Sequence, residues 1–210
     1  MSTAALWIKI CGVTSAEAIS AALAMTVDAI GFVFAPSVRR LEPASAAQLA
    51  VAARGRASLI AVTLQPAQAL VDEIVRVFKP DALQADLADF DGLRLPETLP
   101  RLPVLRAGLP LAGTLPPRLL FEGARSGSGS VADWMAAEPL ARSSELILAG
   151  GLHAHNVAAA LRAVRPYGVD VSTGVESAPG RKSPGKIAEF VLAARAANLG
   201  VAHDRNRHDG

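Results

Sequence analysis

Residues 6–34 have the sequence LWIKICGVTSAEAISAALAMTVDAIGFVF, which contains one complete strand, helix and strand. The apolar runs at residues 6–10 and 28–34 each predict a buried strand. Between them, Thr14 and the glutamate three residues later have the spacing of a capping box, in which both side chains satisfy backbone amides at a helix start. We therefore expect a helix over residues 15–25. Because a crossover helix joins parallel strands, we also expect a parallel sheet.

The same alternation of short apolar runs and longer alanine-rich segments continues along the chain, and it predicts eight strands in all. The other six strands are predicted at residues 59–64, 82–84, 104–107, 119–122, 146–149 and 169–171. Clear helical patterns occupy residues 44–53, 67–78, 131–138, 153–164 and 184–198. Residues 87–100 are weakly patterned, and residues 108–117 contain three prolines, so we expect shortened helices around units four to six.

Eight such units close into a (β/α)8 barrel, the TIM-barrel fold of the α/β class. With 210 residues, against about 250 in a typical barrel of this kind, the domain is expected to be single and compact. An open doubly wound sheet is the alternative, but a G-x-G-x-x-G would then follow the first strand, where this chain has CGVT at residues 11–14. We expect the barrel to cover residues 1–199 and a polar tail to cover residues 200–210.

Composition excludes several classes of protein. The 51% of hydrophobic residues suffices for a core, and the formal net charge of +2 argues against a nucleic-acid binder. The single cysteine excludes an internal disulfide. No apolar run reaches the ~18 residues of a membrane span, and no secretory signal is recognised at the start. The sequence therefore predicts a reduced, cytoplasmic protein without a membrane partner.

Small residues follow the seventh and eighth predicted strands, where barrels of this kind often bind phosphate. Glycines and small side chains let backbone amides approach a ligand, and the helix N-termini that follow favour an anion. The alternative is that each glycine only permits a tight turn. Because the two loops are paired, we favour a binding site made of Gly150, Gly151, Asp170, Ser172, Thr173 and Gly174.

Three other strand ends carry reactive or charged groups. Cys11 precedes a helix N-terminus that would lower its pKa, although a lone cysteine is more often a small buried apolar residue. Arg39 and Arg40 follow the second strand and either lie in a solvated loop or pair with a carboxylate or phosphate. Glu122 ends a buried apolar run, so partial burial would raise its pKa and suit it to proton donation, unless it caps the strand or pairs with Arg125.

No metal site is predicted. His153 and His155 are two residues apart, so they do not share a helix face, and no acidic or thiol partner has ligand spacing. We interpret them as residues of a helix start and of the surface.

Five short motifs are spread over most of the chain. They are residues 9–14 (KICGVT), residues 31–36 (GFVFAP) with Arg40, residues 127–129 (GSG) with Asp133 and Trp134, residues 150–152 (GGL) with Asn156, and residues 170–176 (DVSTGVE) with Pro179, Gly180 and Lys182. Together these motifs resemble the phosphoribosylanthranilate isomerase family of tryptophan biosynthesis.

The resemblance implies an enzyme without a cofactor that catalyses an Amadori rearrangement. Its substrate would be N-(5-phosphoribosyl)anthranilate and its product 1-(o-carboxyphenylamino)-1-deoxyribulose 5-phosphate. The resemblance implies that Cys11 is the base that removes the proton from the sugar C2, and that Arg40 pairs with the anthranilate carboxylate. The phosphate would bind amides around Gly151 and residues 172–174. We expect a monomer or a homodimer.

Two strand ends depart from the family pattern. The family places an aspartate, the general acid, at the end of the sixth strand, where this chain has Glu122 with one more methylene. After the fourth strand Gln84 matches as a substrate-binding residue, but the usual Leu-His-Gly is Ala-Asp-Leu at residues 85–87. These changes leave a second hypothesis open, namely a catalytically impaired phosphosugar-binding barrel that acts as an interaction or regulatory module. A third hypothesis, a sister isomerase of histidine biosynthesis, would require paired aspartates, whereas Cys11 ends the first strand here.

Overall fold

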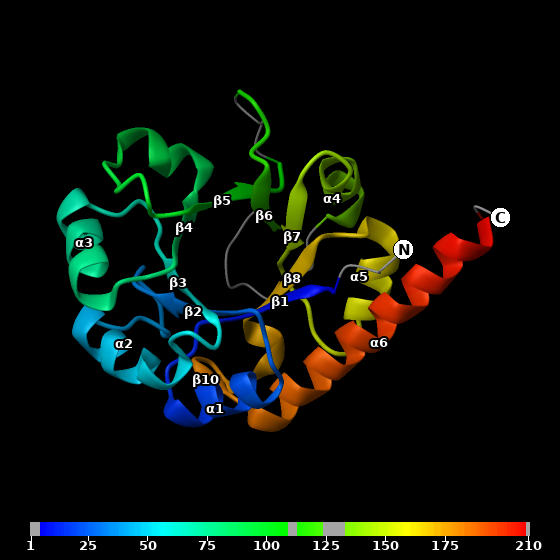
Figure 1. The fold of residues 1–210 in the computed structure, drawn as a ribbon, viewed down its shortest axis with the longest axis horizontal. Helices are drawn as coiled ribbons and strands as arrows, with labels where there is room; N and C mark the ends of the chain where they lie inside the picture. The colour runs from blue at the N-terminus through cyan, green and yellow to red at the C-terminus, as the bar shows by residue number, and fades with distance from the viewer. Residues whose placement is uncertain (1–4, 109–112, 124–132, 209–210) are drawn as a thin grey trace.

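A closed barrel of eight parallel strands forms the centre of the molecule (Figure 1). The computed structural model describes residues 5–108, 113–123 and 133–208, with side chains described as far as residue 200. Each strand pairs with the next in sequence, and β8 pairs with β1 to close the barrel. The strands are β1 Trp7–Cys11, β2 Ala29–Val33, β3 Ser58–Val62, β4 Ala82–Asp86, β5 Arg101–Arg106, β6 Arg118–Glu122, β7 Glu145–Leu148 and β8 Gly168–Val171. The predicted (β/α)8 fold is confirmed.

The helices surround the barrel, and α6 runs along its outside toward the C-terminus (Figure 1). They are α1 Ala16–Ala24, α2 Pro43–Leu49, α3 Gln68–Glu73, α4 Trp134–Ala141, α5 Val157–Val164 and α6 Pro184–His208. Shorter helical turns are η1 Ala50–Ala53, η2 Ile74–Phe78, η3 Leu87–Gly92 and η4 Thr173–Val175. Among the described residues, η3 is the helical segment between β4 and β5, and residues 113–117 before β6 contain no helix. This agrees with the shortened helices expected around units four to six. No described helix is long and apolar enough to cross a membrane.

Several predicted boundaries were wrong. The N-cap of α1 is Ser15, whose hydroxyl accepts a hydrogen bond from the Ala18 amide, whereas the Thr14 hydroxyl donates to the Gly180 carbonyl far along the chain. Strand β4 continues two residues beyond the predicted end because its ladder with β5 extends to Asp86. Helix α6 continues to His208 instead of ending at residue 198. The division of the chain into a barrel and a tail at residue 200 stays a prediction.

Two further differences concern loops. A short hairpin that the sequence did not predict, β9 Glu176–Ala178 with β10 Arg181–Lys182, follows β8. The predicted helix at residues 131–138 begins outside the described residues, which resume at residue 133. Residues 109–112 of the predicted degraded helix at 108–117 also lie outside them.

The alternation of side chains along each strand separates two apolar layers. One layer lies between strands and helices and includes Ile8 and Ile10 of β1. The other lies in the barrel interior and consists of Ala29, Ile60, Leu102, Val104, Leu120, Ile147 and Ala149. Lys9 and Cys11 alternate with the two isoleucines, so they face the interior. Polar groups therefore gather in the barrel, toward the carboxyl ends of its strands.

Candidate active site

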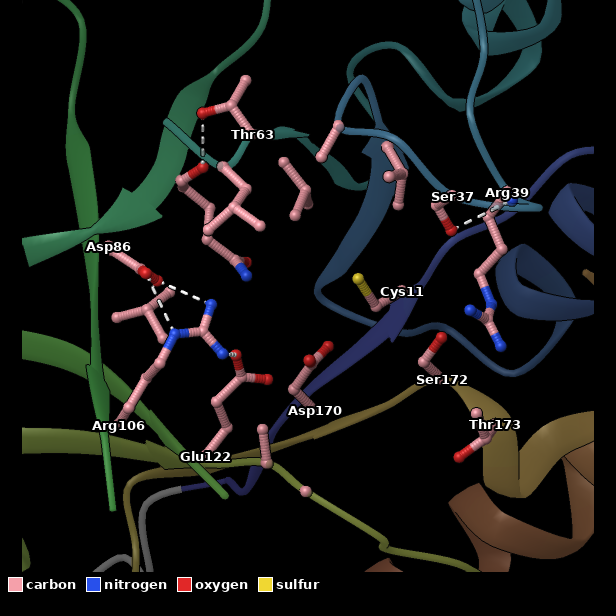
Figure 2. A pocket seen from close by; sticks show the side chains of 18 of the residues that line it. Cys11, Ser37, Arg39, Thr63, Asp86, Arg106, Glu122, Asp170, Ser172 and Thr173 are labelled. Atoms are coloured by element: carbon pink, nitrogen blue, oxygen red, sulfur yellow. Dashed lines mark hydrogen bonds and ion pairs between the residues drawn. The ribbon is translucent and has the colours of Figure 1, made fainter. Parts of the chain in front are cut away.

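A cavity of about 260 Å³ lies at the carboxyl ends of the strands, as expected for a TIM barrel (Figure 2). Its polar lining comes from β1, β4, β5, β6 and β8 and from the loops after β2, β3, β7 and β8. The side chains are Cys11, Ser37, Arg39, Thr63, Gln84, Asp86, Arg106, Glu122, Asp170, Ser172 and Thr173, and Gly150 and Gly151 add backbone. Figure 2 shows Cys11 and Glu122 on different sides of one cavity, both directed into it.

Of the ten predicted site residues, eight line this cavity. They are Cys11, Gln84, Glu122, Gly150, Gly151, Asp170, Ser172 and Thr173. Arg40 and Gly174 are not in the lining. Arg40 is half-exposed and pairs with Glu42 at 3.0 Å, while its neighbour Arg39 is one of the residues that line the cavity. Gly174 packs behind the lining, where a Cβ would lie 2.0 Å from the Leu152 carbonyl oxygen.

Cys11 is buried next to an ion pair. Lys9, two residues earlier on β1, has no exposed surface, and its Nζ lies 2.9 Å from Oδ1 of Asp170 on β8. Burial raises the pKa of Cys11, the Lys9 ammonium lowers it in part, and the Asp170 carboxylate raises it further. The pKa of Cys11 is raised overall, because desolvation outweighs the favourable charges. The expected contribution of the helix N-terminus stays a prediction.

Glu122 lies in a network of charges from three adjacent strands. Nη1 of Arg106 on β5 is 2.6 Å from Oε1 of Glu122. The same guanidinium donates from Nε and Nη2 to the two carboxylate oxygens of Asp86 on β4, at 2.9 and 2.7 Å. Burial would lower the pKa of Arg106, but its hydrogen bonds to Asp86 and the charges of both carboxylates raise it. Arg106 therefore stays charged and fixes one oxygen of Glu122. The Arg125 of the alternative pairing lies outside the described residues.

A second network supports the loop after β8. Arg39 donates two hydrogen bonds to Glu176, at 2.7 and 2.8 Å. Lys182 on β10 donates to the same carboxylate at 2.8 Å and to the Ser172 carbonyl at 2.9 Å. Burial alone would raise the pKa of Glu176, but hydrogen bonds from Arg39 and Lys182 lower it to about 2. Of the two alternatives left open for Arg39, a solvated loop or pairing with a carboxylate or phosphate, the structure shows pairing with a carboxylate.

The loop after β7 has a backbone that favours glycine. Gly150 and Gly151 have φ angles of 86° and 64°, in the left-handed region. The side chain of Asn156 braces this loop, since Nδ2 donates to the Gly151 carbonyl at 2.9 Å and Oδ1 accepts from the His153 amide at 2.8 Å. The loops after β7 and β8 thus lie side by side at the cavity with their backbone held in place.

Gln84 reaches the cavity from β4 and is almost fully buried. Its Oε1 is one of two buried side-chain polar atoms in the described part of the chain that have no hydrogen-bond partner. A buried acceptor without a partner is costly, so this atom is suited to a donor that a ligand would bring.

Arg106 and Asp86 were missed as site residues from the sequence. The prediction ended the fourth strand at Gln84, two residues too early, so Asp86 was treated only as a departure from the family motif. Arg106 fell inside a predicted strand. The available signal was a charged residue at the end of an apolar strand, the same signal that identified Glu122. Across the described ranges, no group of three or more potential metal ligands occurs.

The site and the fold can be compared with known proteins. A family model for N-(5'-phosphoribosyl)anthranilate (PRA) isomerase matches residues 113–193. The chain is 39% identical to the N-(5'-phosphoribosyl)anthranilate isomerase of Mesorhizobium japonicum over 218 residues, which cover 92% of this chain and 97% of that protein.

Solved structures with a similar fold include members of the same family. The phosphoribosyl anthranilate isomerase of Thermus thermophilus is similar with a TM-score of 0.78 and 30% identity, over 92% of this chain and 100% of that one. A phosphoribosyl anthranilate isomerase in complex with reduced 1-(o-carboxyphenylamino)-1-deoxyribulose 5-phosphate shares the fold with a TM-score of 0.73 and 24% identity, over 91% and 99% of the two chains.

Of the five sequence motifs, the GSG at residues 127–129 lies outside the described residues.

Proposed function

The chain belongs to the N-(5'-phosphoribosyl)anthranilate isomerase family of tryptophan biosynthesis, and on this premise we propose that Cys11 is the base and Glu122 the acid of its isomerisation. The observation that carries the proposal is that both side chains enter the same cavity from different sides. A rearrangement that adds a proton to one sugar atom and removes one from another can use an acid for the first step and a base for the second.

The steps follow from this arrangement. The Glu122 carboxyl group gives a proton to the ring oxygen of the ribose, the bond from C1 to that oxygen breaks, and C1 and the anthranilate nitrogen form a Schiff base. The Cys11 thiolate then takes the proton from C2, and the electron pair of that bond moves toward the nitrogen to give an enolamine. A proton then returns to C1 while the C2 hydroxyl group loses its own proton and becomes the carbonyl of the aminoketose. Protons only change place, so no oxidant and no reductant is required.

The remaining lining suits the other parts of the substrate. The braced loops after β7 and β8 offer backbone amides to the phosphate. The unpaired Oε1 of Gln84 is placed to accept a hydrogen bond from a sugar hydroxyl or from the anthranilate amine. Arg40 stays the proposed partner of the anthranilate carboxylate. Since its guanidinium now pairs with exposed Glu42, it would have to leave that contact and turn toward the cavity.

The comparisons give no support to a catalytically impaired barrel. A phosphosugar substrate fits the family and the cavity. The cytoplasmic location and the choice between monomer and homodimer remain predictions. The location is supported by the family's place in tryptophan biosynthesis and by the single buried cysteine, and sedimentation of the purified protein would decide the oligomeric state.

Turnover of freshly generated phosphoribosylanthranilate tests the proposal. Loss of its fluorescence is expected with the wild type and with Val51→Ala, a control on the exposed surface of η1. Cys11→Ala is expected to lower kcat by about 100-fold or more, because a positioned base contributes at least that factor. Equal rates for Cys11→Ala and the wild type would contradict the role of Cys11, and an inactive wild type would contradict the function.

A further inference from the structure

Lys9 is a buried cation that the reaction steps above do not use. Its side chain is among the largest in the chain with no exposed surface. A buried ammonium is expensive unless a partner compensates for its lost hydration. The partner is Asp170, which faces Lys9 in the register between β1 and β8 and accepts a hydrogen bond at 2.9 Å.

The same ammonium lies next to the sulfur of Cys11. Both side chains leave β1 on its inner face, and both pack on Gly31 of β2. A Cβ built on Gly31 would lie 3.0 Å from Sγ of Cys11 and 3.1 Å from Cε of Lys9. The absent side chain at Gly31 therefore lets the sulfur and the end of the lysine share one small space.

We propose that Lys9, oriented by Asp170, is a positioning residue for the base, and that its ammonium stabilises the Cys11 thiolate that removes the C2 proton. This inference rests on the proposed role of Cys11 and adds a group that lowers the free-energy cost of forming the thiolate. Without this charge, burial would raise the pKa of the Cys11 thiol further.

The charges around Cys11 favour Lys9 for this role. Burial raises the pKa of the thiol, and Lys9 is the strongest of the charges that lower it, ahead of Lys182 from β10. The ammonium of Lys182 already donates hydrogen bonds to Glu176 and Ser172.

Other charges complete the surroundings of the thiol. Arg39, from the loop after β2, also interacts with it but is held by two hydrogen bonds to Glu176. Asp170 opposes thiolate formation, and Glu122 faces the same cavity from β6.

Lys9 does not itself transfer a proton. Burial would lower its pKa, but the interactions of the ammonium with Asp170 and Cys11 together raise it. The ammonium thus stays charged while Cys11 cycles between thiolate and thiol. The role of Lys9 is electrostatic, and its loss should change the acidity of the thiol and not only the stability of the barrel.

The experiment uses the full-length protein without substrate. Cys11 is the only cysteine of the sequence, so thiolate absorbance and the rate of alkylation by iodoacetamide, followed against pH, report on it alone. Lys9→Met is expected to raise the apparent pKa of the thiol by about one unit or more, as removal of a close opposite charge does. Lys79→Met, at an exposed site, is the matched control and should leave it unchanged. An unchanged or lowered pKa in Lys9→Met overturns the proposal.

Two further variants separate charge from packing. Asp170→Asn removes the opposing charge and is expected to lower the apparent pKa of the thiol, opposite to Lys9→Met. A shift in the same direction for both overturns the proposal. The double variant removes the whole buried pair, which proteins often tolerate, so it keeps the test available if Lys9→Met fails to fold. Its thiol is expected to titrate above that of Asp170→Asn, and equality of the two overturns the proposal.

Turnover distinguishes this inference from the proposed function. Lys9→Met should lower kcat while KM changes less than threefold, because Lys9 is not part of the cavity lining. The expected thiol shifts in a protein that does not turn over phosphoribosylanthranilate would support the role of Lys9 and contradict the function. An active wild type with no thiol shift in Lys9→Met would support the function and contradict the role of Lys9.

Discussion

Glu122 combines a longer side chain than the family aspartate with a fixed partner. Arg106 holds one carboxylate oxygen of Glu122 and is itself held by Asp86. Shortening Glu122 by one methylene would withdraw its carboxylate from Arg106 or from the substrate. The structure thus gives a physical reason for a glutamate at this position, since the arginine and the acid match one another in length.

We predict different losses for two changes at Glu122. Glu122→Gln cannot donate a carboxyl proton and should lower kcat by about 100-fold or more. Glu122→Asp keeps the chemistry but misplaces it, so its loss should be smaller, at about 10- to 100-fold. Turnover of phosphoribosylanthranilate at saturation measures both. A Gln variant as fast as the wild type would remove the acid role, and a fully active Asp variant would show that the contact with Arg106 is dispensable.

The sequence predicted the individual strand-end residues better than their partners. Cys11, Glu122 and Gln84 were found because each ends an apolar run. The strand-end signal does not show which residues pair with one another, because the partners come from neighbouring strands. The pairing of Lys9 with Asp170, for example, joins residues 161 positions apart and depends on the register at which the barrel closes.

At the scale of elements, the loops after β7 and β8 depend on close packing at Gly174. A Cβ there would lie 2.0 Å from the Leu152 carbonyl oxygen and 2.9 Å from Cβ of His153. Backbone cannot move away as a flexible side chain can. Gly174 is therefore the point at which the two loops lock together, although it does not line the cavity.

We predict that Gly174→Ala separates the two loops. Since the phosphate is expected to bind amides from both, KM should rise about tenfold or more, as loss of one charge-assisted hydrogen bond implies. Gly92→Ala is the control, because a Cβ at Gly92 meets nothing within 4 Å. An unchanged KM in a folded Gly174→Ala variant would contradict the placement of the phosphate.

The boundaries of helices and strands agree with the prediction where local sequence signals determine them. They differ from it where tertiary contacts determine them. Strand β2 lies inside its predicted range because a continuous apolar run marks it. The start of α1 was assigned to the wrong cap, since Thr14 and Ser15 are both good caps and only the contact with Gly180 decides between them. The hairpin after β8 has no alternating apolar pattern, so no local signal marked it.

At the scale of the whole molecule, the network around Glu176 makes stability depend on pH. The pKa of Glu176 is about 2 in the folded protein and 4.5 in its ordinary state. The ionised carboxylate therefore contributes stability that is complete above pH 4.5 and is lost as the pH falls toward 2. A difference of this size corresponds to about 3 kcal/mol.

We predict that Glu176→Gln lowers the free energy of unfolding by about 3 kcal/mol at neutral pH and reduces its decline between pH 4.5 and 2. Urea unfolding at several pH values measures both effects. Glu97→Gln, at an exposed glutamate, is the control and should change neither. Parallel pH curves for Glu176→Gln and the wild type would contradict the assigned pKa.

The overall architecture was predictable because eight repeats of one pattern permit few arrangements. Closure itself is a property of the complete chain, since β1 at residues 7–11 finds its second neighbour only at residues 168–171. During synthesis on a ribosome, the barrel cannot close until β8 has emerged, and Lys9 has no carboxylate partner before that point. Truncation by a premature stop codon upstream of β8 would thus abolish catalysis and leave an open sheet edge for chaperones or proteases to recognise.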